Sequence, residues 1–271
     1  MKILITGVAG FIGFNLALFL IKKKYRVYGI DNFDTYYSVG IKKKRIKILK
    51  KNSNFLFNKI DIVNKKKVKS FFDKTKIDLV IHLAAQAGVR YSYKNPKKYV
   101  DVNIFGFINI IDEVKNHKIK KFIYGSSSSV YGENKNFPLK ENQSLKPKNI
   151  YAVSKKINEE TAELYQKIYN LNCIGLRFFT VYGEWGRPDM FIFKLFKSFM
   201  NKEIFYLNNY GNHLRDFTYI GDVVKAVHGL INKKFKDHEV INICSSRPIN
   251  IYDIVKNFRK KNFFQLKLTK I

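Results

Sequence analysis

Short apolar runs alternate along the chain with longer segments in which apolar residues recur every three or four positions. The runs have the length and content of buried parallel strands, and the longer segments have the period of helices that cover a sheet. The predicted strands are Lys2–Thr6, Arg26–Ile30, Asn54–Lys59, Leu79–Leu83, Lys121–Ser126 and Cys173–Phe178. The predicted helices between them are Phe11–Lys23, Val39–Lys51, Lys65–Lys74, Lys97–His117 and Tyr151–Tyr169. This order predicts an α/β fold with a doubly wound parallel sheet.

The alternation becomes irregular after Arg177. Further helices are predicted at Met190–Asn201 and Asp222–Ile231, and short strands near Ile204–Leu207 and Val240–Ile243. We therefore expect a large domain over residues 1–177, to which residues 214–243 return, and a smaller lobe from residues 178–213 and 244–271.

A glycine turn joins the first predicted strand to the first predicted helix. Gly7, Gly10 and Gly13 permit a tight turn and a close backbone approach, so that a diphosphate can rest on the amides at the helix N-terminus. The second strand leads into Asp31, whose carboxylate is placed to accept hydrogen bonds from an adenosine ribose. The large domain is therefore predicted to be a Rossmann-type domain that binds NAD rather than NADP. The alternative is a turn that only packs a helix against the sheet.

Tyr151 and Lys155 lie four positions apart in a predicted helix and so share one face. An ammonium beside a phenol favours the phenolate, whose ordinary pKa near 10 is otherwise too high for a base at neutral pH. Tyr151 is therefore a candidate general base for a reaction that moves a proton together with a hydride. The same spacing also occurs by chance in many helices.

The chain is strongly basic, with 51 Lys and Arg against 21 Asp and Glu and a net charge of +30. Such a charge raises the possibility of nucleic-acid binding. The basic residues are spread along the chain, however, and in the densest run, Lys42–Lys51, they alternate with an apolar face of Ile41, Ile46 and Leu49. We interpret this run as a solvated helix, expect no specific nucleic-acid partner, and expect the positive field to attract anionic substrates.

The two cysteines, Cys173 and Cys244, lie in separate apolar segments, which is typical of a protein from a reducing compartment. No leader peptide is evident, and the longest apolar stretch, Phe11–Ile21, is too short to span a bilayer. We expect a cytoplasmic protein without membrane insertion. The five histidines show no metal-ligand spacing, so no metal site is predicted.

Eight stretches make the sequence resemble an extended short-chain dehydrogenase/reductase (SDR), and within that superfamily a nucleotide-sugar epimerase of the UDP-glucuronate 4-epimerase family. Gln86–Arg90 and Trp185–Met190 are the stretches specific to the uronate enzymes. The eight are Thr6–Gly13, Asp31–Tyr37, His82–Arg90, Ser126–Gly132, Tyr151–Lys155, Arg177–Gly183, Trp185–Met190 and Arg215–Ile220.

The resemblance implies roles for individual residues. Tyr151, Lys155 and Ser127 would be catalytic, with Ser127 bonded to the sugar 4-oxygen. NAD would be held by Gly7, Gly10, Phe11, Ile12, Gly13, Asp31, Asn32, Asp61, Ile62, Leu83, Ala84, Ala85 and Asn103, together with Tyr151 and Lys155. The UDP-sugar would be held by Gln86, Arg90, Ser128, Thr180, Arg187 and Arg215. The reaction implied is oxidation at C4, rotation of the 4-keto sugar and reduction on its other face.

Several roles have a structural alternative. Arg187 is expected to grip the sugar carboxylate, which must be held still because a 4-keto uronate can lose carbon dioxide, but it could be a surface arginine. Arg215, assigned to the diphosphate, could form a structural ion pair, and Gln86 and Arg90 could pack their loop. Ser128 and Ser129 stand where related dehydratases and decarboxylases carry acidic residues, which favours epimerisation.

The chain ends at Ile271, before a segment that the resemblance leads us to expect in the substrate lobe. Two alternatives to a uronate epimerase therefore remain open: a 4-epimerase of a neutral UDP-hexose, and an impaired remnant that binds NAD. The resemblance also implies a homodimer, paired through helices at Lys97–His117 and Tyr151–Tyr169.

Overall fold

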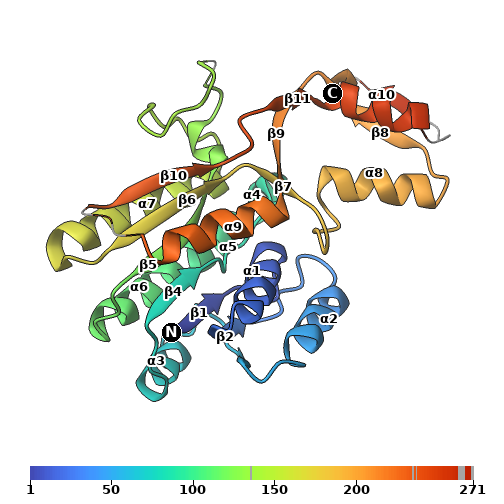
Figure 1. Cartoon of the computed structure of the whole chain (residues 1–271). Helices are drawn as coiled ribbons and strands as arrows, with labels where there is room; N and C mark the ends of the chain where they lie inside the picture. Colours follow the sequence, from blue (N-terminus) through green and yellow to red (C-terminus); the bar gives the residue numbers. More distant parts are fainter. Residues whose placement is uncertain (135, 234, 236, 262–265, 270–271) are drawn as a thin grey trace. The chain divides into compact units, whose positions relative to one another are not determined.

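A computed structural model describes residues 1–134, 136–233, 235, 237–261 and 266–269 of the chain. The described residues divide into two units, which Figure 1 shows in one view. Unit 1 comprises Met1–Phe178 and Val224–Ile243, and unit 2 comprises Phe179–Val223 and Cys244–Ile271.

In the described part of unit 1, seven parallel strands form one sheet in the order β10-β6-β5-β4-β1-β2-β3. The α/β, doubly wound prediction is confirmed, because successive strands add first on one side of β1 and then on the other. The strands are β1 (Lys2–Thr6), β2 (Arg26–Asp31), β3 (Phe55–Lys59), β4 (Leu79–His82), β5 (Phe122–Ser127), β6 (Cys173–Phe178) and β10 (Glu239–Ile243).

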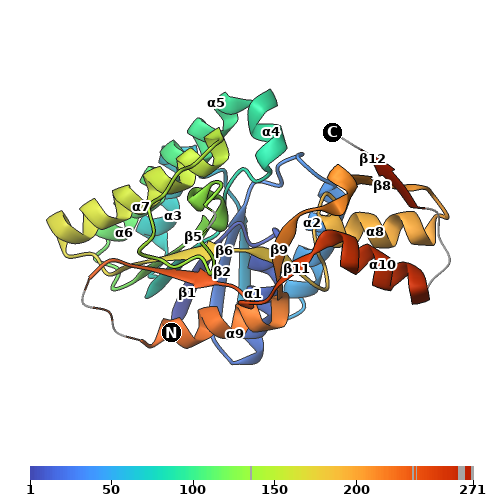
Figure 2. The ribbon, with the colours of Figure 1, turned by 90° about the horizontal axis from the view of Figure 1, so that it is seen from above.

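Helices cover both faces of this sheet. Viewed from above, α3, α6 and α7 lie on one face and α1, α2 and α9 on the other (Figure 2). Their bounds are α1 (Phe11–Lys22), α2 (Val39–Leu49), α3 (Lys65–Lys74), α6 (Gly106–Asn116), α7 (Ile150–Tyr169) and α9 (Ile220–Ile231), the last continuing from unit 2 into unit 1.

The core between the sheet and the α3, α6 and α7 layer consists of large apolar side chains. Phe107, Phe122 and Tyr124 are fully buried there, and their rings meet at centroid distances of 5.4 to 5.7 Å. Burial of such side chains supplies most of the driving force for folding. This burial is the reason why the helical period and the apolar strand runs could be recognised in the sequence.

The predicted helix Lys97–His117 is divided in the structure. It consists of α5 (Pro96–Tyr99), a π-helical turn (Val100–Phe105) and α6, and it is preceded by a short helix, α4 (Val89–Lys94). A π turn inside a helix is rare and frequently marks a functional site. Here the buried Asn103 sits inside the turn and bonds to other segments, as described below.

Unit 2 is built from short elements that the sequence pattern only partly predicted. In the described residues, β11, β9 and β7 form one sheet and β12 pairs with β8. Leu195, Phe205, Leu207 and Val255 form its buried cluster. The elements are β7 (Thr180–Tyr182), α8 (Phe191–Met200), β8 (Phe205–Asn208), β9 (Leu214–Tyr219), β11 (Pro248–Asn250), α10 (Ile251–Lys261) and β12 (Leu266–Thr269).

None of the helices in the described ranges combines the length and apolar character needed to cross a lipid bilayer.

Candidate active site

The strand order reverses between β1 and β4, and the carboxyl ends of these two strands are linked by one side chain. Thr6 Oγ1 accepts hydrogen bonds from the backbone N–H groups of Leu83 (3.1 Å) and Ala84 (3.0 Å), and it lies 2.8 Å from Nδ1 of His82. Its hydroxyl hydrogen is therefore donated to His82. Such a reversal point is where open α/β sheets bind ligands.

His82 is held neutral at this point. Burial and the nearby Lys155 lower its pKa to about 3, so its Nδ1 can accept the hydrogen bond from Thr6 at all physiological pH values. The three contacts around Thr6 fix the chain as it leaves β4, where Leu83 to Gln86 begin the next loop.

The glycine turn after β1 can be made only by glycines. A Cβ on Gly13 would lie 2.4 Å from the carbonyl oxygen of Gly7, and Gly7 itself has a φ of +69°. Gly10 precedes α1, and no side chain caps this helix start. The amides of the first turn therefore suit a diphosphate, which the helix dipole also favours.

Both sides of the peptide at Ala9, inside this turn, are fixed. Ala9 N–H donates to Oδ2 of Asp31 at 3.0 Å, and Nη1 of Arg45 donates to the Ala9 carbonyl at 2.7 Å. Burial raises the pKa of Asp31, against the lowering effect of backbone hydrogen bonds from Phe33 and Ala9 and of the nearby Lys42. The Asp31 carboxylate thus supports the turn, and a carboxylate has lone pairs enough to accept ribose hydroxyls as well.

Arg45 and Lys42 correct the interpretation of the basic helix as fully solvated. Both are buried in the structure, on the same face of α2 as Ile46 and Leu49. The Nζ of Lys42 donates to the carbonyl of Asp34 at 2.6 Å. Lys42, Arg45, Ile46 and Leu49 are spaced three or four positions apart, which is the sequence signal for a shared buried face. The neighbouring lysines made this signal difficult to recognise.

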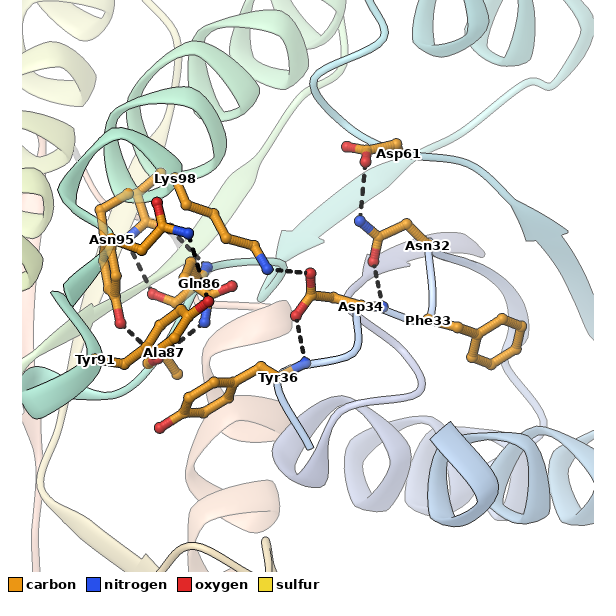
Figure 3. Close-up of polar contacts among 12 residues, drawn as sticks. Asn32, Phe33, Asp34, Tyr36, Asp61, Gln86, Ala87, Tyr91, Asn95 and Lys98 are labelled. Carbon is orange, nitrogen blue, oxygen red and sulfur yellow. Dashed lines mark hydrogen bonds and ion pairs between the residues drawn. The ribbon is translucent and has the colours of Figure 1, made fainter. Parts of the chain in front are cut away.

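The loop after β2 is folded by its own side chains (Figure 3). Asp34 N–H donates to Oδ1 of Asn32, and Tyr36 N–H donates to Oδ1 of Asp34, both at 2.9 Å. Asn32 also bonds to Oδ2 of Asp61 at 2.9 Å, so two of the predicted cofactor residues hold each other.

An ion pair joins this loop to the segment that follows β4. Lys98 Nζ lies 2.6 Å from Oδ2 of Asp34, and the rings of Tyr36 and Tyr91 pack at 5.0 Å (Figure 3). Although burial alone would raise the pKa of Asp34, its hydrogen bonds from Lys98 and Tyr36 leave it lower than usual.

Asn103 holds the start of the β4–α4 loop on α7. Its Oδ1 accepts from Gln86 N–H at 2.7 Å, and its Nδ2 donates to the Gln86 carbonyl at 3.1 Å and to Ser154 Oγ at 2.9 Å. Gln86 is buried and donates from Nε2 to the Ala87 carbonyl. Through these contacts Asn103 and Gln86 position the loop that follows β4. Arg90, by contrast, is exposed on α4.

Tyr151 and Lys155 lie on α7, which Asn149 caps by accepting from Ala152 N–H. The buried Lys155 donates from Nζ to the Gly125 carbonyl of β5 at 2.7 Å. Burial lowers its pKa to about 8, although Glu159 acts in the opposite direction. Tyr151 is partly buried, and its ring meets that of Tyr99 edge-on at 6.1 Å.

Ser127 ends β5, two residues after Gly125, and so lies on the strand to which Lys155 is bonded. Its Oγ is 3.2 Å from Ser129 Oγ and accepts from Ser129 N–H at the same distance. Ser128 begins the next helical turn and is partly buried. Unit 1 therefore contains a phenol, an ammonium and a hydroxyl of the kinds that a proton transfer uses.

The remaining predicted substrate residues belong to unit 2. Thr180 begins β7 and is partly buried. Arg187 directs its fork at Asp189, with Nε at 2.9 Å from Oδ1 and Nη2 at 2.5 Å from Oδ2. Arg215 is exposed on β9, and its Nη1 donates to the Leu214 carbonyl.

Asp216 is a structural residue that the sequence did not single out. It is buried on β9 and accepts from Ser245 N–H (2.8 Å), Ser245 Oγ (3.0 Å) and Arg247 N–H (3.0 Å). It thereby fixes the backbone that leads into β11, next to Arg215.

Among the described residues, one group has the composition of a metal site: Asp73, Glu113 and His117, on α3 and α6. The His117 ring lies 3.3 Å from Asp73 and 3.4 Å from Glu113, and Asp73 also bonds to Lys69. Asp73 and His117 are exposed and Glu113 is buried, and Nδ1 of His117 also lies 3.0 Å from the Glu113 carbonyl oxygen.

The reversed strand order, the glycine turn and Asp31 define a Rossmann-type dinucleotide-binding protein. Residues 3–244 match the model of the NAD dependent epimerase/dehydratase family. The chain belongs to this family, and its cofactor is NAD.

Individual relatives cover most of the chain. Protein CapI of Staphylococcus aureus is 42% identical over 279 residues, which span 96% of this chain and 83% of the relative. A UDP-glucuronate 4-epimerase of Thermodesulfobacterium geofontis is 40% identical over 257 residues, 93% of this chain and 78% of the relative. The structure is similar to that of the Bacillus cereus UDP-glucuronic acid 4-epimerase in complex with UDP-glucuronic acid and NAD, with a TM-score of 0.93, 37% identity, and coverage of 100% of this chain and 86% of the other.

Replacement of Thr6 by Val should lower the free energy of unfolding by about 2–3 kcal/mol, because Ala84 N–H and His82 Nδ1 lose a buried partner while the side-chain shape is kept. Urea denaturation would measure this. The matched variant Thr6→Ser retains the hydroxyl and should lose clearly less. Equal losses in the two variants would show that the methyl group, and not the hydroxyl, carries the effect.

Proposed function

We propose that the protein catalyses the NAD-dependent 4-epimerisation of a UDP-sugar, with UDP-glucuronate as substrate and UDP-galacturonate as product. The observation that carries this proposal is the joining of Lys155, one turn from Tyr151 on α7, to the end of β5 that bears Ser127. The names of the relatives supply the substrate class, since a UDP-glucuronate 4-epimerase is among them.

In this proposal Tyr151 takes the proton of the sugar 4-hydroxyl and later returns it to the same oxygen. The Lys155 ammonium stabilises the phenolate, and the Ser127 hydroxyl bonds to the 4-oxygen while its charge changes. NAD, when bound, supplies the oxidation and the subsequent re-reduction of C4. Because the sugar turns between the two steps, the configuration inverts without net oxidation.

The described residues fit the cofactor. We assign the diphosphate to the amides of the Gly7–Gly13 turn, including Phe11 and Ile12, and the adenosine ribose to Asp31 and Asn32. Asp61 and Ile62 would border the adenine, and Leu83, Ala84 and Ala85 would border the other half of the molecule. The contacts of Thr6, Arg45 and Asn103 hold these segments in place.

We assign the sugar carboxylate to Arg187, with Ser128 and Thr180 as further donors, and the diphosphate of UDP to Arg215. Gln86 and Arg90 belong to the loop that would border the sugar. Asp189 already receives two hydrogen bonds from Arg187, so it would hold the guanidinium in orientation until a substrate carboxylate shares or replaces it.

The variant Tyr151→Phe should retain NAD and its melting temperature but lose about 10²- to 10⁴-fold in turnover, because the proton acceptor is removed. Conversion of UDP-glucuronate, followed by NMR, is the measurement. Inversion that persists in this variant would contradict the mechanism. A wild-type protein that converts UDP-glucose but not UDP-glucuronate would be a neutral-hexose epimerase, and one that converts no donor despite bound NAD would be a cofactor-binding remnant.

The variant Arg187→Ala should lose about 30-fold more activity on UDP-glucuronate than on UDP-glucose, because a charge-assisted fork contributes roughly 2 kcal/mol towards a carboxylate only. Steady-state rates on both donors would test this, with Arg259→Ala on α10 as a control that alters neither rate. Equal losses on both substrates would reject the carboxylate assignment.

We also propose a homodimer. Phe105, Leu164 and Ile168 are 55%, 55% and 66% exposed on the π turn and α7, which leaves an apolar surface on these helices. Light scattering coupled to gel filtration should give twice the chain mass of 31.9 kDa, and Leu164→Glu together with Ile168→Glu should halve it. A monomeric wild-type protein would refute the proposal.

We infer a cytoplasmic location from the reduced state of the two cysteines, of which Cys173 is buried and Cys244 partly buried. Cell fractionation would place the protein, and recovery from a secreted fraction would reject this inference.

A further inference from the structure

A buried ion pair lies one helical turn beyond Lys155. Glu159 on α7 and Arg177 on β6 have side chains that are 6% and 4% exposed. Arg177 grips the carboxylate with two hydrogen bonds, from Nε to Oε1 at 2.9 Å and from Nη2 to Oε2 at 2.7 Å. Removing two charges from water costs free energy, and the two hydrogen bonds between Arg177 and Glu159 offset this cost.

Further partners come from other elements of unit 1. Ser126 Oγ, on β5, donates to Oε1 of Glu159 at 2.5 Å. Arg177 Nη1 donates to the Tyr131 hydroxyl at 2.8 Å and to the Glu141 carbonyl at 3.0 Å. The Glu159 carboxylate therefore accepts hydrogen bonds from β5 and β6 while belonging to α7.

This pair is adjacent in sequence to the residues proposed for catalysis. Ser126 immediately precedes Ser127, and Glu159 follows Lys155 by four positions, on the same face of α7. Lys155 itself is bonded to Gly125, one residue before Ser126. The same short stretch of β5 is thus bonded to α7 twice, once through an ammonium and once through a carboxylate.

The charges around Lys155 make Glu159 distinctive. Two buried cations, Lys155 and Arg177, lie near one buried carboxylate. Of the other titratable groups facing this region, His82 on β4 is neutral, and Tyr124 on β5 is a fully buried phenol whose pKa is raised by burial. His238, which precedes β10, lies 2.7 Å from the Tyr124 hydroxyl, and burial lowers its pKa against the opposing effects of Glu163 and Glu159. On α7 itself Tyr151 is partly buried, and the pairs Lys156–Glu160 and Lys167–Glu163 lie at the surface.

We propose that Glu159 is a positioning residue that keeps Lys155 in its ammonium form and holds the Ser126–Ser127 end of β5 against α7. This inference rests on the proposed epimerase function, in which that ammonium stabilises the phenolate of Tyr151. Glu159 touches neither sugar nor cofactor in this role, and it acts through Lys155 and Ser127.

The electrostatics support the geometry. Burial lowers the pKa of Lys155 to about 8, and Glu159 is the group that counteracts this effect. Loss of the carboxylate charge would lower the pKa of Lys155 further, because Arg177 would then lie nearby without its counter-charge. The ammonium form would be lost at a lower pH, and with it the stabilisation of the Tyr151 phenolate.

The test is the pH profile of the NAD-loaded full-length variant Glu159→Gln. Since activity requires charged Lys155, the basic limb of the turnover profile should move down by about one pH unit, the size of effect expected for removing a nearby opposite charge. Glu160→Gln, at a neighbouring exposed position on α7, should leave the profile unchanged. If Glu159→Gln reduces turnover by the same factor at every pH, with the basic limb unmoved, the role is merely structural and the proposal is overturned.

A second readout separates this proposal from the proposed function. The Lys155 ammonium, followed by nitrogen-15 NMR of lysine-labelled protein and assigned as the signal absent from Lys155→Met, should titrate at lower pH in Glu159→Gln than in the wild type. This measurement needs no turnover, so a wild type that converts no UDP-sugar would refute the epimerase assignment while the titration still tests Glu159. An unchanged midpoint would overturn the proposal.

If Glu159→Gln does not fold, Glu159→Asp replaces it. This variant keeps the charge but shortens the side chain, so the Lys155 titration should stay within about a few tenths of a pH unit of the wild type even where turnover falls. A midpoint that moves downward despite the retained charge would overturn the proposal.

Discussion

The hydrogen bond from Lys155 to the Gly125 carbonyl joins the two elements on which the proposed chemistry depends. It places the Lys155 ammonium of α7 against the end of β5. Tyr151 lies one turn before Lys155 and Ser127 lies two residues after Gly125, so both belong to the elements that this hydrogen bond joins. A lysine buried at this point is costly, because burial opposes its charge. The cost is tolerated because the Gly125 carbonyl and the Glu159 carboxylate both favour the ammonium.

Much of the Rossmann half could be predicted from local patterns. The six strands expected in the first 178 residues occur within one residue of their predicted bounds at either end, because each contains a short apolar run, which in β1, β4, β5 and β6 is buried on both faces. The glycine turn and Asp31 could be located because glycine spacing and the end of a buried strand are local signals. The family resemblance then brought Ser127 and Asn103 into the site, although the contacts of Asn103 could not have been read from the sequence.

What the sequence could not reveal are the contacts made between distant segments. Arg45 lies within a lysine-rich run, and only the three-dimensional structure shows its bond to the glycine turn. The π turn depends on Asn103 reaching Gln86, and no local propensity encodes that contact. In unit 2 the strands are short and pair in two small sheets, so their apolar pattern was too brief to distinguish β7, β9 and β11 from loops. The pairing of Arg187 with Asp189 was likewise legible only in the structure.

The π turn at Val100–Phe105 has a consequence for how this chain can vary. A π turn accommodates one more residue than the α-helix it interrupts, and each residue of a helix turns the side chains that follow by about 100°. The π turn takes up its extra residue locally, so the side chains before and after it keep the phase of one continuous helix. Loss of that residue would return the segment to α-helical geometry and leave the stripe of Phe107, Ile110, Ile111 and Val114 on the core. It would, however, turn Asn103 away from the backbone of Gln86. The extra residue thus serves the direction of one amide side chain and not the packing of the helix that follows.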